Sequence, residues 1–181
     1  MLDRKAFHWA MQKGLAVVSG TDCHGPMFEL VDARDQAYRQ MTLIFATEKS
    51  VEGIRDALDN RRSVVFADDH LYGPEKYLAE MFKAILSPVS VSVKNEKMYV
   101  RLHNTNSIPL EFSKREDTHP EVYMSYNPYR LNRDEEDTLT FFTTDGSPMP
   151  DSLTVDIIVH NFWCDVDVPV QVEVTFTRTK K

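Results

Sequence analysis

The sequence predicts an α+β protein whose two parts follow one another along the chain. Up to about residue 70, segments with helical hydrophobic spacing alternate with short apolar segments, as in a βα domain. Downstream of residue 88 the hydrophobic period becomes two, which is typical of an all-β domain. We therefore expect a βα domain over residues 1–70, a linking helix over 71–87, and an immunoglobulin-like β-sandwich over 88–181.

Composition excludes several classes of protein. The chain has 181 residues, of which 42% are hydrophobic and 27% charged, and its apolar runs are too short to span a bilayer. A net charge of -7 and the lack of a basic cluster argue against general nucleic-acid binding. No secretory signal is visible at the start, so the chain as given is expected in the cytoplasm. The two cysteines, Cys23 and Cys164, form no CxxC motif and are interpreted as reduced thiols.

The first helix is expected over residues 3–13, where apolar side chains recur three and four positions apart. Gly14 follows as a typical helix stop. Residues 15–19, with the sequence LAVVS, are then expected to form a buried strand.

A second unit follows, with strands over residues 42–46 and 63–67 and a helix over 51–60 between them. Ser50 is the expected N-cap of that helix. Short apolar strands separated by helices favour a parallel sheet buried on both faces. A third helix is expected over residues 74–85, with proline in its first turn. The apolar stripe of the helix over 51–60 comprises Ile54, Ala57 and Leu58, and that of the third helix comprises Tyr77, Leu78, Met81, Phe82 and Ile85.

The second part begins with a β-hairpin over residues 89–104 that reverses at Asn95 and Glu96. Turn-rich stretches at 127–137 and 144–152 separate later strands. The acidic run at 134–137 is expected to be a solvated loop, because it lacks the ligand spacing of calcium loops. The later strands are expected at residues 108–112, 121–126, 138–144, 153–163 and 169–177.

A D-x-H motif provides the clearest candidate for chemistry. Asp22 and His24 lie in the stretch GTDCHGP, directly after the strand expected at residues 15–19. In an extended segment both side chains project to the same side, so a carboxylate and an imidazole could bind one divalent ion or two adjacent ones. An Asx turn at Asp22 and a surface His24 explain the same residues without a metal.

The stretches GLAVVSGTDCHGP and MTLIFATEKSVEGIRDALDNRRSVVF resemble the end of a PHP-superfamily domain, the polymerase-and-histidinol-phosphatase type of metal-dependent phosphoesterase. The resemblance covers about the first 70 residues and implies a remnant of a βα barrel in which Asp22 and His24 are metal ligands. From the third helix onward the chain resembles the carboxy-terminal β-domain of a bacterial subgroup, the Sb-PDE-type phosphodiesterases. On the helix end, the resemblance falls on Ala57, Leu58, Arg61 and Arg62.

The sequence departs from this family because it has no H-x-H motif, so most of the family's metal ligands are missing. We therefore expect the carboxy-terminal part of a longer phosphoesterase, inactive by itself. The resemblance implies that the parent uses zinc, manganese or iron to activate water against a phosphate ester, and that some intact parents are exported to the periplasm. Arg39 is a candidate phosphate contact, although a solvated loop arginine is the more common explanation of such a residue. The other histidines are isolated and are interpreted as structural: His8, His70, His103, His119 and His160.

A non-catalytic alternative is a β-sandwich that serves as a binding or oligomerisation module. Its surface would use aromatic side chains, which core and turn packing would also explain. The open sheet edge of a barrel remnant further predicts either a homodimer or an ordered amino-terminal segment lying on the β-domain. The aromatic candidates are Tyr123, Tyr126, Tyr129, Phe162 and Trp163.

Overall fold

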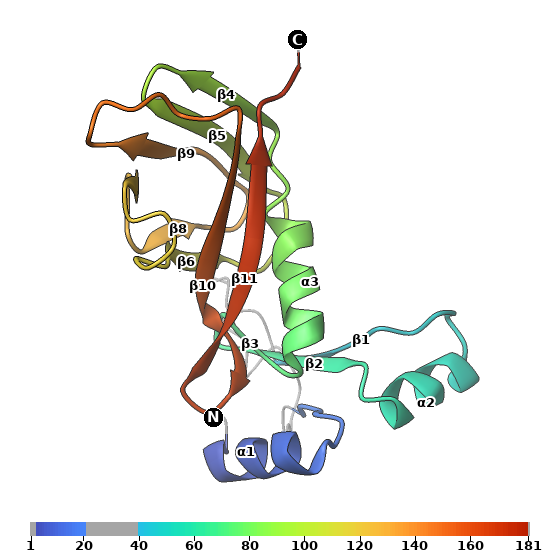
Figure 1. Ribbon diagram of the computed structural model, residues 1–181. Helices are drawn as coiled ribbons and strands as arrows, with labels where there is room; N and C mark the ends of the chain where they lie inside the picture. Colours follow the sequence, from blue (N-terminus) through green and yellow to red (C-terminus); the bar gives the residue numbers. More distant parts are fainter. Residues whose placement is uncertain (1–2, 21–39, 181) are drawn as a thin grey trace, which may run out of the picture. The chain divides into compact units, whose positions relative to one another are not determined.

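The computed structural model confirms the α+β class (Figure 1) and describes residues 3–20 and 40–180. The chain divides into two compact units. The first unit comprises Met1–Leu78 and Phe162–Pro169, and the second comprises Ala79–Asn161 and Val170–Lys181. None of the described helices is long and apolar enough to cross a membrane.

Helix α1 (Arg4–Lys13) confirms the first expected helix. The Asp3 side chain caps its start by accepting a hydrogen bond from the Ala6 amide at 3.0 Å. Gly14 ends it in the left-handed conformation, with a φ of 61°. Phe7 is the buried residue of this helix and belongs to a small core cluster with Val17, Val65 and Ala67.

The expected strand at residues 15–19 is wrong: the segment is irregular and forms no ladder with a neighbouring strand. Only Val17 in this apolar run is buried, and 67% of Val18 is exposed. Side-chain hydroxyls hold the backbone instead. The Ser63 hydroxyl donates to the Val17 carbonyl at 2.8 Å, and Thr42 Oγ1 accepts from the Ser19 amide at 2.9 Å.

The parallel sheet expected around the second helix is also wrong, since strand β1 (Met41–Ile44) pairs antiparallel with β2 (Ser63–Ala67). Ile44, the last residue of β1, lies opposite Ser63, the first residue of β2. The chain therefore leaves and re-enters the sheet at the same end of this strand pair, and the helix lies in the connection between the two strands. A helix between two strands indicates a parallel crossover only if the chain returns to the starting edge, and here it does not.

Helix α2 (Val51–Asp59) forms where the sequence predicts it. Ser50 caps its start by accepting from the Gly53 amide at 2.9 Å. Ala57 is fully buried, but 43% of Ile54 is exposed, so its apolar stripe is only partly covered. Helix α3 (Glu75–Ile85) likewise forms where expected and contributes residues to both units.

Strand β3 (His70–Tyr72) was not expected from the sequence. Asp68 and Asp69 both have positive φ, at 51° and 65°, which is the two-residue turn that closes a tight hairpin. β3 pairs antiparallel with β2 and parallel with the end of β10 (Ser152–Asp165), where Trp163 lies opposite Tyr72. Phe162 and Trp163 therefore extend the sheet of β1, β2 and β3.

The second unit contains two sheets, which supports the expected β-sandwich. One is antiparallel and ordered β4, β5, β9, β7. In the other, β10 pairs with β6 and β11, and β6 pairs with β8. Phe141 and Phe176 face each other across the two sheets with ring centroids 5.3 Å apart. The strands are β4 (Ser90–Lys94), β5 (Lys97–Asn104), β6 (Leu110–Lys114), β7 (Val122–Met124), β8 (Tyr129–Leu131), β9 (Glu135–Thr143) and β11 (Val168–Thr177).

The acidic run at residues 134–137 is not the expected loop, because its last three residues belong to β9. Glu136 forms an ion pair with Arg101 on the neighbouring strand, at 2.5 Å. Asp137 accepts a hydrogen bond from the Tyr129 hydroxyl at 2.8 Å. These cross-strand partners explain why acidic residues occupy a strand here.

Candidate functional site

The predicted site residues Asp22, His24 and Arg39, together with Cys23, lie outside the described residues. The D-x-H metal motif and the phosphate contact therefore stay predictions. The structure describes the residues on both sides of this segment, Gly20 and Gln40.

A cavity of about 390 Å³ lies in the first unit, and both Gly20 and Gln40 line it. The rest of its described lining is mainly apolar and comes from Asp3, α1, residues 16–19, β2 and Tyr72. The Ser19 hydroxyl donates to Gln40 Oε1 at 3.2 Å, which holds the two sides of this lining together. Of the described cavities, this one lies nearest along the chain to the D-x-H motif.

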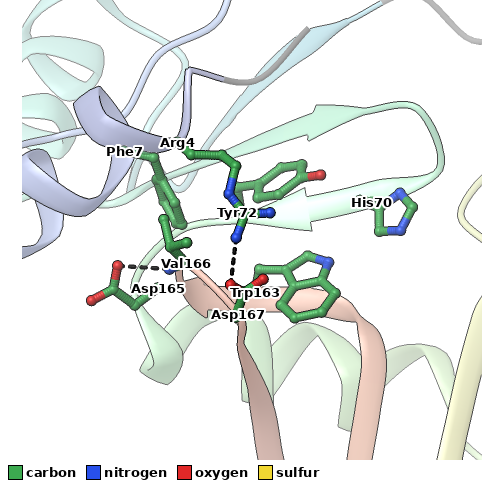
Figure 2. Close-up of a pocket in the computed structure, with 8 residues that line it drawn as sticks. All are labelled: Arg4, Phe7, His70, Tyr72, Trp163, Asp165, Val166 and Asp167. Atoms are coloured by element: carbon green, nitrogen blue, oxygen red, sulfur yellow. Dashed lines mark hydrogen bonds and ion pairs between the residues drawn. The ribbon is translucent and has the colours of Figure 1, made fainter.

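A smaller cavity of about 150 Å³, also in the first unit, has aromatic walls (Figure 2). His70 and Tyr72 alternate along β3 and so share one face of the sheet, and Trp163 lies opposite Tyr72 on β10. The His70 ring centroid is 6.1 Å from that of Tyr72 and 6.5 Å from that of Trp163. Figure 2 shows these three rings around one opening, with Arg4 and Asp167 at its margin.

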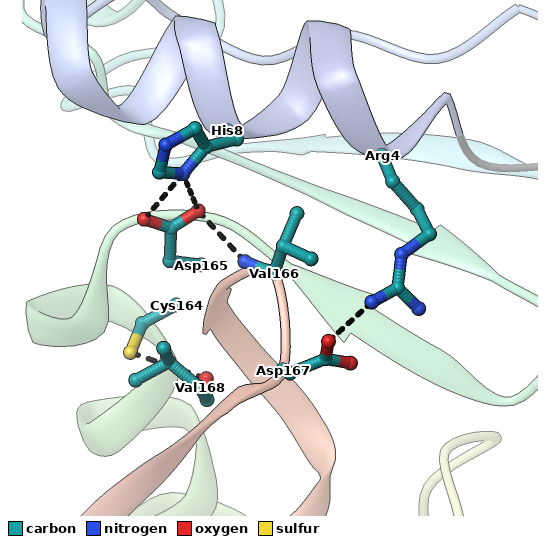
Figure 3. A network of polar contacts seen from close by, with 7 residues as sticks. All are labelled: Arg4, His8, Cys164, Asp165, Val166, Asp167 and Val168. Carbon is teal, nitrogen blue, oxygen red and sulfur yellow. Dashed lines mark hydrogen bonds and ion pairs between the residues drawn. The ribbon is translucent and has the colours of Figure 1, made fainter.

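Polar pairs connect α1 to the end of β10 and to the turn that follows it, within the first unit (Figure 3). His8 Nδ1 lies 2.9 and 3.0 Å from the two carboxylate oxygens of Asp165, and Arg4 forms an ion pair with Asp167. Burial acts to raise the pKa of Asp165, but bonds from His8 and from the Val166 amide lower it, and the net shift is downward. Asp165 is therefore ionised at neutral pH.

Two other groups near this cavity stay protonated at neutral pH. Burial raises the pKa of Tyr72, and the Asp68 carboxylate raises it further, against a smaller opposite effect of Arg4. Burial, followed by the charge of Glu75, raises the pKa of the Cys164 thiol, which donates to the Val168 carbonyl. Cys164 is a free thiol, as expected, and its environment does not activate it as a nucleophile.

The described histidines each have a polar neighbour, in accord with the structural interpretation. His70 Nδ1, for example, lies 2.6 Å from the Asp68 carbonyl oxygen, and His160 Nε2 lies 2.8 Å from the Ser113 hydroxyl. Within residues 3–20 and 40–180, no group of three His, Cys, Asp or Glu side chains is arranged to hold a metal ion.

The aromatic residues considered for a binding surface occupy different environments. Tyr129 and Phe162 are buried, whereas 48% of Tyr123 and 65% of Tyr126 are exposed. Trp163 lies in the first unit and lines the smaller cavity. Sequence reasoning missed this cavity, although the Asp-Asp turn before the alternating H-L-Y segment could have indicated a hairpin there.

Comparison with known proteins found no matching family model and no matching curated protein. Among solved structures, the chain is similar to a two-domain protein containing a predicted PHP-like metal-dependent phosphoesterase from Bacteroides vulgatus ATCC 8482. The identity is 25% and the TM-score 0.86, over 97% of this chain. The chain spans 50% of the length of that protein. A second match, the archaellum periplasmic stator protein FlaG from Sulfolobus acidocaldarius, has a TM-score of 0.29 and 13% identity over 49% of this chain, which is too low to indicate a shared fold.

Proposed function

We propose that this chain is one part of a metal-dependent phosphoesterase of the PHP-like kind, and that it contributes Asp22 and His24 to the metal centre. The observation that supports this proposal is the likeness, over 97% of the chain, to a two-domain protein with a predicted PHP-like phosphoesterase. The chain corresponds to about half of that protein, so the remaining ligands would come from polypeptide outside this sequence. The Sb-PDE-type phosphodiesterases are the subgroup proposed from the sequence.

The chemistry of the two side chains fits a divalent ion. Carboxylate and imidazole are ligands for zinc, manganese and iron alike. Catalytic zinc sites use three protein ligands, so Asp22 and His24 alone are too few for catalysis. A divalent ion held there would act as a Lewis acid and lower the pKa of a bound water. Arg39 would contact the phosphate ester, because a guanidinium matches phosphate oxygens in a fork.

The alternative is a non-catalytic binding or oligomerisation module. The exposed rings of Tyr123 and Tyr126 in the second unit favour this candidate. A homodimer would accord with either candidate. The two differ in metal binding, since the module needs no ion and would self-associate equally in the presence of a chelator.

Metal binding by the full chain tests the proposal. Equilibrium dialysis against MnCl₂ or ZnCl₂, with metal analysis of the protein compartment, gives the affinity of the wild type, Asp22→Ala and His24→Ala. We expect each variant to bind at least about tenfold more weakly than the wild type, because each loses one of two ligands. His119→Ala is the matched control, since His119 lies in the second unit and is exposed.

Equal metal uptake by the wild type and both ligand variants would overturn the proposed ligands. Hydrolysis of bis(p-nitrophenyl) phosphate tests whether this chain alone is catalytically active. We expect the chain with metal to give no more product than the metal alone, because the ligand set is incomplete. Turnover that depends on Asp22 would show instead that the chain is a complete enzyme.

A further inference from the structure

The charge around the smaller cavity of the first unit favours a cationic ligand. Asp165 and Asp167 line it, Asp165 with its carboxylate bonded to His8 and Asp167 paired with Arg4. The charge of Asp68 also acts on Tyr72 in its wall. Arg4 is the one permanently charged cation among the described lining residues. A phosphate or carboxylate group would meet net negative charge here, whereas a cation would be attracted.

The aromatic walls of the cavity also favour a cation. The faces of aromatic rings carry partial negative charge and attract cations, and the indole of tryptophan attracts them more strongly than the rings of tyrosine and phenylalanine do. Trp163 and Tyr72 lie on paired strands and point to the same side of the sheet, with His70 beside them. Figure 2 shows that the three rings border one opening.

Arg4 and Asp167 form the polar margin of this opening. Their side chains are 61% and 72% exposed, so the ion pair contributes little to stability and can open at low cost. Opening it would leave the Asp167 carboxylate available to a cation bound against the exposed side of the rings. The guanidinium of Arg4 would then compete with such a ligand.

We propose that this cavity binds the alkylammonium group of a small organic cation, such as the trimethylammonium group of choline. A volume of about 150 Å³ is below the roughly 300 Å³ at which pockets for drug-sized ligands begin, so it suits a head group of this kind. Cages of aromatic rings recognise quaternary ammonium groups, and Asp167 adds a carboxylate at the margin of this cavity. The proposal does not depend on the proposed metal ligands, because it is argued only from lining residues that the structure describes.

Fluorescence of Trp163 provides a direct test. The chain has two tryptophans, so Trp9→Phe leaves Trp163 as the single reporter. This variant is titrated with choline chloride at constant ionic strength and, separately, with 3,3-dimethylbutan-1-ol, which has the same shape without the charge. We expect saturable binding of choline in the millimolar range, and binding of the alcohol at least about tenfold weaker. An equal response to both compounds would overturn the proposal.

Two further variants in the Trp9→Phe background test the role of charge. Asp167→Asn removes the carboxylate while keeping a residue that tolerates the φ of 58°, and we expect it to weaken choline binding about threefold or more. Arg4→Ala removes the competing guanidinium and should leave binding unchanged or tighter. Asp134→Asn is the matched control, because Asp134 is an exposed aspartate with a φ of 51° in the second unit.

The source of the head group is tested with vesicles. Co-sedimentation with phosphatidylcholine vesicles is measured with and without excess free choline. We expect the chain to stay in the supernatant while free choline still binds. Sedimentation with vesicles in the absence of measurable binding of free choline would overturn the small-molecule assignment, and loss of choline binding in Arg4→Ala would overturn the cation site.

Discussion

The hydroxyl of Ser63 should contribute measurably to stability, because it replaces a strand ladder for the segment at residues 15–19. Ser63 is fully buried, and its hydroxyl donates to the Val17 carbonyl at 2.8 Å. Ser63→Ala removes that donor and leaves the Val17 carbonyl without this hydrogen bond. Loss of such a bond costs about 1–3 kcal/mol, since the group left behind is not rehydrated.

Urea unfolding followed by tryptophan fluorescence measures this cost. Trp9 and Trp163 both belong to the first unit, so the signal reports the unit that contains Ser63. A loss of about 2 kcal/mol at an m-value of about 2 kcal/mol/M would lower the urea midpoint by about 1 M. Ser92→Ala, at an exposed serine in the second unit, serves as the control and should leave the midpoint unchanged.

A Ser63→Ala midpoint within error of the wild type would refute this reasoning. It would mean that the bond to the Val17 carbonyl is replaced by water or contributes nothing. The m-value must be the same in both proteins for the comparison to report stability alone.

Two more predictions follow from buried or paired polar groups. His8→Gln should raise the pKa of Asp165, measured by NMR titration, because it removes a partner of the ionised carboxylate. The pKa of Asp165 is lower in the folded state, so its stabilising effect is present above the unfolded pKa and is lost as the pH falls through the folded pKa. The variant should therefore unfold at a higher pH than the wild type on acidification. Identical acid transitions would contradict this. Asn161→Ala should lower the thermal midpoint, because the buried amide accepts from the Glu111 amide at 3.1 Å and donates to the Pro109 carbonyl at 2.7 Å; an unchanged midpoint in scanning calorimetry would contradict it.

Local sequence signals predicted the helices well. Asp3 and Ser50 cap the helices that follow them, and Gly14 ends the first one in the left-handed conformation. These residues act within one turn of chain, so a single sequence contains all the information they need. The hairpin of β4 and β5 was predictable for the same reason, because Asn95 tolerates the φ of 54° that its turn requires.

The orientation of strands was not predictable in this way. The antiparallel pairing of β1 with β2 depends on where the chain re-enters the sheet after α2, and no local residue determines that. The segment at residues 15–19 has the composition of a strand, yet hydroxyls on β1 and β2 take up its backbone groups. Composition shows that a segment is apolar but does not identify its hydrogen-bond partners.

The two parts of the candidate site differ in how far sequence could lead to them. The D-x-H motif at Asp22 and His24 is a local pattern, and the likeness to a PHP-like protein gives it a physical context. The residues of the aromatic cavity are far apart in the sequence, because most of the second unit lies between Tyr72 and Trp163 along the chain. Only the pairing of β3 with β10 brings the two side chains to one face.

That pairing also has a consequence for how the chain is divided. Residues 162–169 return to the first unit after the chain has built most of the second, and they carry three lining residues of the cavity besides Trp163. A linear reading assigns such a segment to the domain that surrounds it in sequence. Because β10 contributes to both units, its first ten residues follow the alternation of the second unit, while Trp163 and Asp165 serve the first. The end of a long strand can therefore belong to a different part of the fold than the rest of the same strand.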